Sequence, residues 1–500
     1  MEDGYEAGDR QPRRDETALA SCRESEGDEV NVFRYPQRTI YEGIYRSLIP
    51  DQKLLLWEKW MLKIDSVLED NELIEMVHEA LGRRRVHSRT RGRKGTPSEV
   101  VLRLMVLKHA KNWSYETLER EVRANLIYRD FTRIGGEPVP DAKTMVRLGQ
   151  ALGPVVTRKI HLRVVQMAQE EKVIRGRKMR VDTTVVETNI HYPTDSSLLG
   201  DGVRVLTRIM KSIEEEVGRT GTKVRERLRS VGHRLVEIGR ASRGRGEDAK
   251  DKQKSAYRKL MSVTRKIVGQ ARVVIREVRQ GIKKAPDLQG QLMVDTWVRQ
   301  LIDFSALTHR VLEQTKARVI QGNTHFKDKL LSIFETATEA IRKGKAAKPT
   351  EFGKMVKIQE AENQIVTDYE VFEERPADQT ILMPSIDKHQ AILGQVPELV
   401  AADAGFFSAE NEADAQQAGV EKIAVPNKRT RSPARWALQR ERWFRRAQRW
   451  RVGCEGRISV LKRRHGLFRC RYKGIPGMER WVGFGVIANN LINIARVTTK

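Results

Sequence analysis

The chain has almost none of the features that would place it in a membrane or in an oxidising compartment. It has 500 residues but only three cysteines, Cys22, Cys454 and Cys470, which form neither a CxxC pair nor an even set. A disulfide framework and a structural zinc site are therefore not expected. Because the chain has no apolar run of 18 residues and no signal-peptide pattern, we expect a cytoplasmic protein without a membrane segment.

Acidic residues are scarce relative to basic ones. There are 93 lysines and arginines against 66 aspartates and glutamates, which gives a net charge of +27 and a pI near 10. This excess is not confined to one tail, and it points to a polyanionic partner, most often nucleic acid. A length of 500 residues also exceeds what one hydrophobic core supports, so two to four domains are expected.

The N-terminal third reads as a tail followed by helices. Residues 1–30 are polar and poor in aliphatics, which predicts a disordered tail. Residues 31–175 contain apolar residues at helical spacing, separated by turns, and include a basic run formed by Arg83, Arg84, Arg85, Arg89, Arg91, Arg93 and Lys94. Short helices beside a basic run favour a DNA-binding domain. A helical dimerisation domain with a solvated basic loop explains the pattern equally well.

The rest of the chain predicts an α/β fold that is interrupted by helices. A strand rich in β-branched residues begins near residue 178, and strands and helices alternate between 350 and 470. Between them, residues 203–349 carry apolar residues at alternating spacings of three and four, which is typical of helical hairpins. We therefore predict a core formed by 176–202 and 350–470, a helical insertion, and a C-terminal amphipathic helix within 471–500.

One long basic helix is predicted from Ser432 to Arg464. Its tryptophans, Trp436, Trp443 and Trp450, recur every seven residues and are expected to face the sheet. Glu455 lies more than about 100° away from them, within about 60° of Gln448, Arg451 and Lys462.

Two aspartates are placed on strands that could be neighbours. Asp182 lies within the first strand, and Asp403 ends the strand "PELVAAD", where ligands commonly bind an α/β sheet. Two facing carboxylates repel unless a cation lies between them, and Mg²⁺ suits oxygen ligands. Asp368, on a presumed hairpin strand, is expected at the surface.

Together, "VDTTVVETNIHYPTD", "ADAGFF" and the spacing Arg451-x3-Glu455-x6-Lys462 resemble DDE transposases of bacterial insertion sequences, the ISNCY group in particular. "SYETLEREVRANLIYRDFTRIGGEPVPDAKTM" is similar to their helical DNA-binding region. The resemblance covers most of residues 95–200 and 350–498. It departs at Gln448, where related transposases often have a tyrosine, so no step that the family assigns to the tyrosine carries over.

The resemblance implies an RNase H-like core in which Asp182, Asp403 and Glu455 hold two Mg²⁺ ions, with Mn²⁺ as a substitute. Arg451 and Lys462 would neutralise phosphate charge, and the basic helix would follow the DNA backbone. Its DNA-binding residues would be Lys428, Arg429, Arg431, Arg435, Arg442, Arg445, Arg446 and Arg449. The expected partners are double-stranded DNA of the nucleoid and further copies of the chain, in dimers or larger assemblies.

Two other readings are kept. The first is a transposase-derived protein that binds DNA without cutting it. Such a protein would not need the three carboxylates, and all three are present, which favours the enzyme. An RNA- or ribosome-associated coiled-coil protein explains the charge and the middle helices, but not the two strand aspartates.

Overall fold

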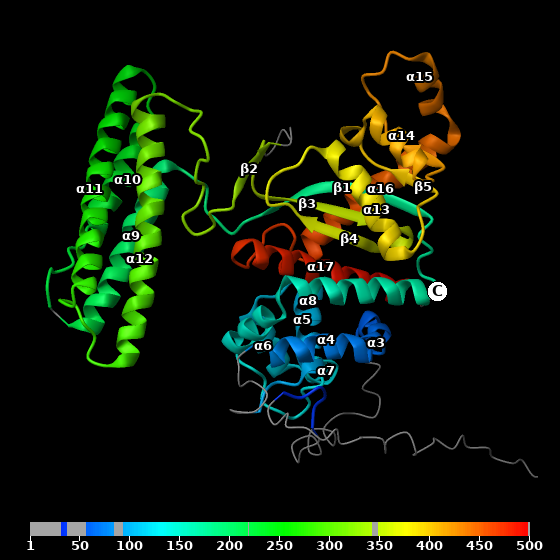
Figure 1. The fold of residues 1–500 in the computed structure, drawn as a ribbon, viewed down its shortest axis with the longest axis horizontal. Helices are drawn as coiled ribbons and strands as arrows, with labels where there is room; N and C mark the ends of the chain where they lie inside the picture. Colours follow the sequence, from blue (N-terminus) through cyan, green and yellow to red (C-terminus); the bar gives the residue numbers. More distant parts are fainter. Residues whose placement is uncertain (1–31, 38–56, 85–93, 219, 343–348, 499–500) are drawn as a thin grey trace, which may run out of the picture.

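The computed structural model describes residues 32–37, 57–84, 94–218, 220–342 and 349–498. The predicted disordered tail lies outside these ranges. Figure 1 shows a sheet flanked by helices, a group of short helices on one side of it, and a block of long helices set apart from both. Among the described helices, none is long and apolar enough to cross a membrane.

Among the described residues, six α-helices precede the sheet. They are α3 (Lys59–Asp65), α4 (Asn71–Gly82), α5 (Ser98–Ala110), α6 (Tyr115–Ala124), α7 (Leu126–Phe131) and α8 (Ala142–Glu170). Polar side chains define where several begin, since Asp70, Ser114, Asn125 and Asp141 each accept a hydrogen bond from the first turn. The long α8 is kinked at Gly153 and Pro154.

The sheet contains β1 (Lys178–Glu187), β2 (Glu339–Arg342), β3 (Thr350–Glu360), β4 (Val366–Val371), β5 (Leu399–Ala401) and β6 (Lys422–Ala424). Its strand order is β2-β3-β1-β5-β6, and β4 also pairs with β3. β3 runs antiparallel to β1, β2 and β4, whereas β5 is parallel to β1 and β6 is parallel to β5. The mixed α/β sheet predicted from the sequence is confirmed. The strand β2 was not predicted, since it lies in the range expected to be helical.

Two helix layers enclose the sheet. On one face of β1, Met179 and Val181 pack against Ile386 of α13 (Leu382–Leu393), near α14 (Ala409–Gln417). On the other face, Val186 packs with Leu461 of α16 (Arg442–Arg464). Even-numbered residues of β1 therefore face α16, because side chains alternate along a strand.

The predicted long basic helix is in fact two helices. Glu441 has extended backbone angles and separates α15 (Pro433–Arg440) from α16. Trp443 and Trp450 pack beside Ala401 and Ala424 at the sheet, as predicted. Trp436 lies on α15 and is 50% exposed, so its predicted place in the packed stripe is wrong.

The last helix, α17 (Gly474–Val497), is buried on several sides instead of along one amphipathic face. It lies between the sheet and α8 (Figure 1) and contacts α5, α8 and β4. Its asparagines satisfy main-chain groups that no strand reaches. Asn490 both accepts from Val366 N–H and donates to Val366 C=O, and Asn493 donates to Gln364 C=O.

Asp368 was expected at the surface, but it is only 2% exposed. It lies on β4 between Arg158 of α8, at 2.5 Å, and Lys357 of β3, at 3.0 Å. Two cations compensate the desolvation of this carboxylate, which attaches α8 to the sheet. His161 of α8 reinforces the attachment through Nε2, 2.9 Å from Val366 C=O.

Four long helices lie between β1 and β2. They are α9 (Asp195–Val217), α10 (Leu228–Ala241), α11 (Glu247–Arg279) and α12 (Leu288–Thr315), followed by a π-helical turn at Lys316–Ile320. Their apolar residues form a hydrophobic cluster of their own, which runs from Leu198 to Ile333. In Figure 1 they stand to one side of the sheet, with α11 farthest from it.

The buried histidines should make stability depend on pH. Burial lowers the pKa of His161 to about 4 and that of His465 to about 4. At pH 5 an unfolded histidine is protonated while these two are not, so the free energy of unfolding should fall by about 2 kcal/mol per histidine between pH 7 and pH 5. Urea denaturation at the two pH values measures this.

His161→Asn should remove about 2 kcal/mol of that pH dependence, since it removes one of the two groups. His309→Asn, at an exposed histidine of α12, serves as the matched control and should leave the pH dependence as it is. An unchanged pH dependence in His161→Asn would show that His161 is not the neutral buried group described above.

Candidate active site

Asp182 lies on β1 at the face covered by α16. Its side chain is 17% exposed, and Oδ1 accepts a hydrogen bond of 2.7 Å from Thr183 N–H. Oδ2 is 3.8 Å from Nη1 of Arg451 on α16. A largely buried carboxylate that faces a cation is a candidate functional group.

Asp403 follows β5 on the strand next to β1. The parallel register pairs Lys178 with Leu399 and Arg180 with Ala401. The described pairing ends at Arg180 and Ala401, so Asp182 and Asp403 each lie two residues beyond the last paired positions of two neighbouring strands. The Asp403 side chain is exposed and accepts from Ala404 N–H, where the chain leaves the sheet.

Glu455 reaches the same region from α16. Arg451, one turn earlier, forms an ion pair with it, in which Nη2 lies 3.0 Å from Oε1, while Nη1 faces Asp182. One guanidinium therefore joins two of the three predicted carboxylates. Nε of Arg451 is buried without a hydrogen-bond partner in the part of the chain that the structure describes.

Two further predicted positions occupy the same helix. Gln448 donates through Nε2 to the carbonyls of Ala402, at 3.3 Å, and of Ala424. It thereby fastens α16 to the ends of β5 and β6. Lys462 lies two turns beyond Glu455 and is half-buried.

A buried ion-pair network beneath the site was not predicted. Arg180 stands opposite Glu360 of β3 and donates to its carboxylate through both Nε, at 2.9 Å, and Nη2. Arg457 of α16 lies 3.9 Å from the same carboxylate and donates to Asn489 of α17 at 2.8 Å. Burial raises the pKa of Glu360, and the two guanidiniums oppose that shift.

This network brings α16 close to β1. Arg180 donates to Trp450 C=O and lies 4.8 Å from the centre of the Trp450 ring. A Cβ at Gly453 would come within 2.5 Å of Arg180 Nη1, so the approach requires glycine. The sequence did carry a signal, because Arg180 precedes Asp182 by two residues on a strand and must share its face.

Cys454, beside Glu455, is a packing residue. It is buried, and burial raises the pKa of its thiol well above the usual value, with further increases from Glu360 and Asp182. Such a thiol does not ionise near neutral pH and is a poor nucleophile or metal ligand.

The predicted DNA-binding residues are placed unevenly. Arg83, Arg84 and Lys94 are exposed, but Arg83 pairs with Glu79, and Arg85, Arg89, Arg91 and Arg93 lie outside the described residues. Exposed positions near and along α16 include Lys428, Arg429, Arg431, Arg442, Arg445, Arg446 and Arg449. Arg435 differs from these, because it is 11% exposed and pairs with Glu412 at 2.5 Å. Its main role is therefore in packing α15 against α14.

The three carboxylates suit Mg²⁺ by their chemistry, since all their donor atoms are hard oxygens. Within the described residues, no group of three or more His, Cys, Asp or Glu side chains is close enough to hold a metal ion. Arg451 supplies the positive charge between Asp182 and Glu455 instead.

Glu360→Gln should destabilise the protein strongly, because it leaves Arg180 and Arg457 buried without a counter-charge. The expected loss is about 3–5 kcal/mol of the free energy of unfolding, measured by urea denaturation. Glu398→Gln is the matched control, since Glu398 is exposed and lies 3.6 Å from Arg177; its loss should stay below about 1 kcal/mol. Equal losses in the two variants would contradict the role given to Glu360.

Comparison with known protein families gives two matches. Residues 55–150 match a transposase domain (DUF772), and residues 413–495 match a transposase DDE domain. The second match contains Arg451, Glu455 and Lys462, whereas Asp182 and Asp403 lie outside both. No curated protein and no solved structure matches the chain significantly. The ISNCY group stays a prediction, but the two transposase domains confirm that this chain resembles the DDE transposases of insertion sequences.

Proposed function

We propose that this protein is a transposase that binds the ends of its element, cuts them in a metal-dependent reaction and joins them to target DNA. The observation that carries the proposal is the link from Asp182 through Arg451 to Glu455, on β1 and α16, next to β5, the strand that pairs with β1 and precedes Asp403. The two matched transposase domains support the same conclusion.

Asp182, Asp403 and Glu455 would hold two Mg²⁺ ions, for which Mn²⁺ substitutes. When bound, these ions supply the activation of a hydroxyl and the neutralisation of charge at phosphorus. Arg451, which contacts Asp182 and Glu455, would bind a non-bridging phosphate oxygen, because guanidinium groups pair with phosphates as well as with carboxylates. Lys462 would add positive charge two turns away on α16.

The strand order supports an RNase H-like catalytic core made of residues 176–202 and 350–470. Three antiparallel strands (β4, β3, β1) are followed by two parallel ones (β5, β6), and the helices α9–α12 enter after the first strand. We assign residues 31–175 to DNA binding, 203–349 to the helical insertion and 471–500 to the helix that joins the first and last parts. In this proposal dimers or larger assemblies act on paired ends within the bacterial cytoplasm.

Cleavage tests the proposal. Labelled duplex carrying the DNA that flanks the gene is incubated with purified protein, with Mg²⁺, with Mn²⁺ or without metal. We expect metal-dependent cuts at fixed positions. Asp182→Asn should slow cutting at least about 100-fold, a loss of the size seen when one electrostatic group is removed from an active site.

Asp387→Asn is the matched control, because Asp387 is an exposed carboxylate on α13. It should cut like the wild type. If wild type and Asp182→Asn bound the flanking DNA equally and neither cut it with either metal, the protein would be a transposase-derived DNA-binding protein.

A further inference from the structure

After an acidic start at Glu247, Asp248 and Asp251, the helix α11 is one-sided in charge. From Lys252 to Arg279 it carries nine lysines and arginines and a single acid, Glu277. That acid is buried and accepts from Thr222, so it does not offset the exposed charge. A solvated helix normally mixes both signs at spacings of three and four, because like charges there oppose each other.

Five of these basic residues form what we term the α11 arginine stripe: Arg258, Arg265, Arg272, Arg276 and Arg279. All five are exposed, and none makes an ion pair with any residue that the structure describes. Other basic residues of the same helical block do find acids, for example Lys211 with Glu226 and Lys259 with Glu237. The positive charge of the stripe is therefore not balanced by acidic residues within the part of the chain that the structure describes.

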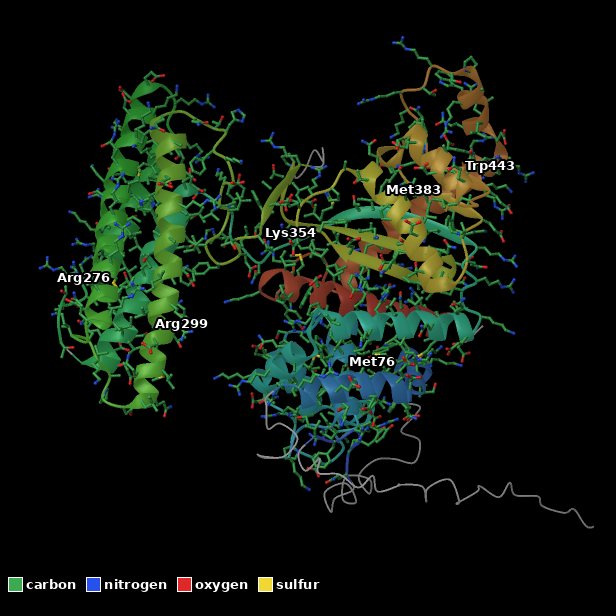
Figure 2. The ribbon with its side chains drawn as sticks, viewed as in Figure 1. Met76, Arg276, Arg299, Lys354, Met383 and Trp443 are labelled. Carbon is green, nitrogen blue, oxygen red and sulfur yellow. The ribbon has the colours of Figure 1, made fainter. Side chains whose placement is uncertain are left out.

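The position of the stripe leaves it accessible. α11 lies on the side of the helical block that faces away from the sheet, and Figure 2 labels Arg276 on that side. Residues seven apart lie almost in line on a helix, so the stripe runs along the axis for about 32 Å. One turn of duplex DNA is about 34 Å long.

The middle of the stripe is hollowed. Gly269 has no atom within 4 Å of where a Cβ would stand, and it lies between Arg265 and Arg272. These three residues line a groove of about 330 Å³, together with Val268, Leu312, Lys316 after α12 and the His309–Glu313 pair. Arg265, Arg272 and Lys316 outnumber the single acid of the groove, Glu313, so its net positive charge suits a phosphate group.

We propose that the α11 arginine stripe binds the phosphate backbone of duplex DNA, independently of base sequence. This surface is separate from the predicted contacts of α16 and of the loop after α4, and it gives the helical block a role in holding DNA. The inference rests on the proposed function only in naming DNA as the polyanion.

Salt-dependent binding tests the stripe. The full-length protein is titrated with an arbitrary duplex of about 40 base pairs, without divalent metal, at several salt concentrations. Replacing Arg265, Arg272, Arg276 and Arg279 with glutamine should reduce the slope of log affinity against log salt by about 3 to 4, since each lost phosphate contact removes about 0.9. Affinity at about 0.1 M salt should fall at least tenfold.

Two further variants separate charge from folding and from overall charge loss. The same four positions changed to lysine should keep most of the slope. A control variant removes the same amount of charge elsewhere, by changing to glutamine four exposed residues at the start of β1 and on α13: Arg175, Arg177, Lys178 and Lys388. This variant should also keep most of the salt dependence of binding.

An unchanged slope in the stripe variant would overturn the proposal. If that variant instead lost self-association, measured by light scattering, the stripe would be an interface between copies. An absence of duplex binding by the wild type would overturn the proposal as well. Failure of the proposed function would be seen separately. In that case the protein would bind duplex, the stripe variant would lose the expected salt dependence, and no metal-dependent cleavage would occur.

Discussion

The buried pair between Arg180 and Glu360 is the contact on which the arrangement of the site depends. It joins β1 to β3 across the sheet, and its guanidinium also reaches the α16 backbone at Trp450. Because Asp182 lies two residues from Arg180, any movement of α16 relative to this pair would shift Arg451 and Glu455 relative to Asp182. A buried ion pair adds little net stability, but it allows few alternative positions for the elements that share it.

The helix α17 imposes a second constraint, because it joins the helices α3–α8 to the sheet. It shares one hydrophobic cluster with α3–α8, through Phe484, Ile487 and Leu491. Its asparagines meanwhile satisfy the edge of β4. The helices before the sheet are thus packed on the core through a helix that follows the sheet in the sequence, and cannot settle into this arrangement before α17 has been synthesised.

Local patterns predicted the elements well, whereas pairing and helix breaks depended on distant contacts. The strand at Asp182 and the turn after Asp403 were visible in the sequence. The register between β1 and β5 was not visible in the sequence, because it is set by hydrogen bonds between strands more than 200 residues apart. β2 has the composition of a helix, Glu-Ala-Ile-Arg, and is a strand because it pairs with β3.

The break at Glu441 has a similar cause. The residues around it are good helix formers, but Arg435 turns inward to Glu412 and to Val425 C=O, and so sets the direction of α15. At the site itself, the sequence predicted three carboxylates and Arg451, and the structure links Asp182, Arg451 and Glu455. It missed Glu360, because nothing in its own neighbourhood shows that its partner is Arg180.

The place where the helical block joins the sheet has a consequence for the order of folding. Glu187 and Gly353 lie opposite each other on β1 and β3, although 165 residues separate them. Since α9–α12 have a core of their own, the block can collapse on the ribosome before β3 has been synthesised. Once the block has folded, the flexible segment between β1 and β3 is shorter. The folded insertion therefore lowers the entropic cost of pairing the two strands.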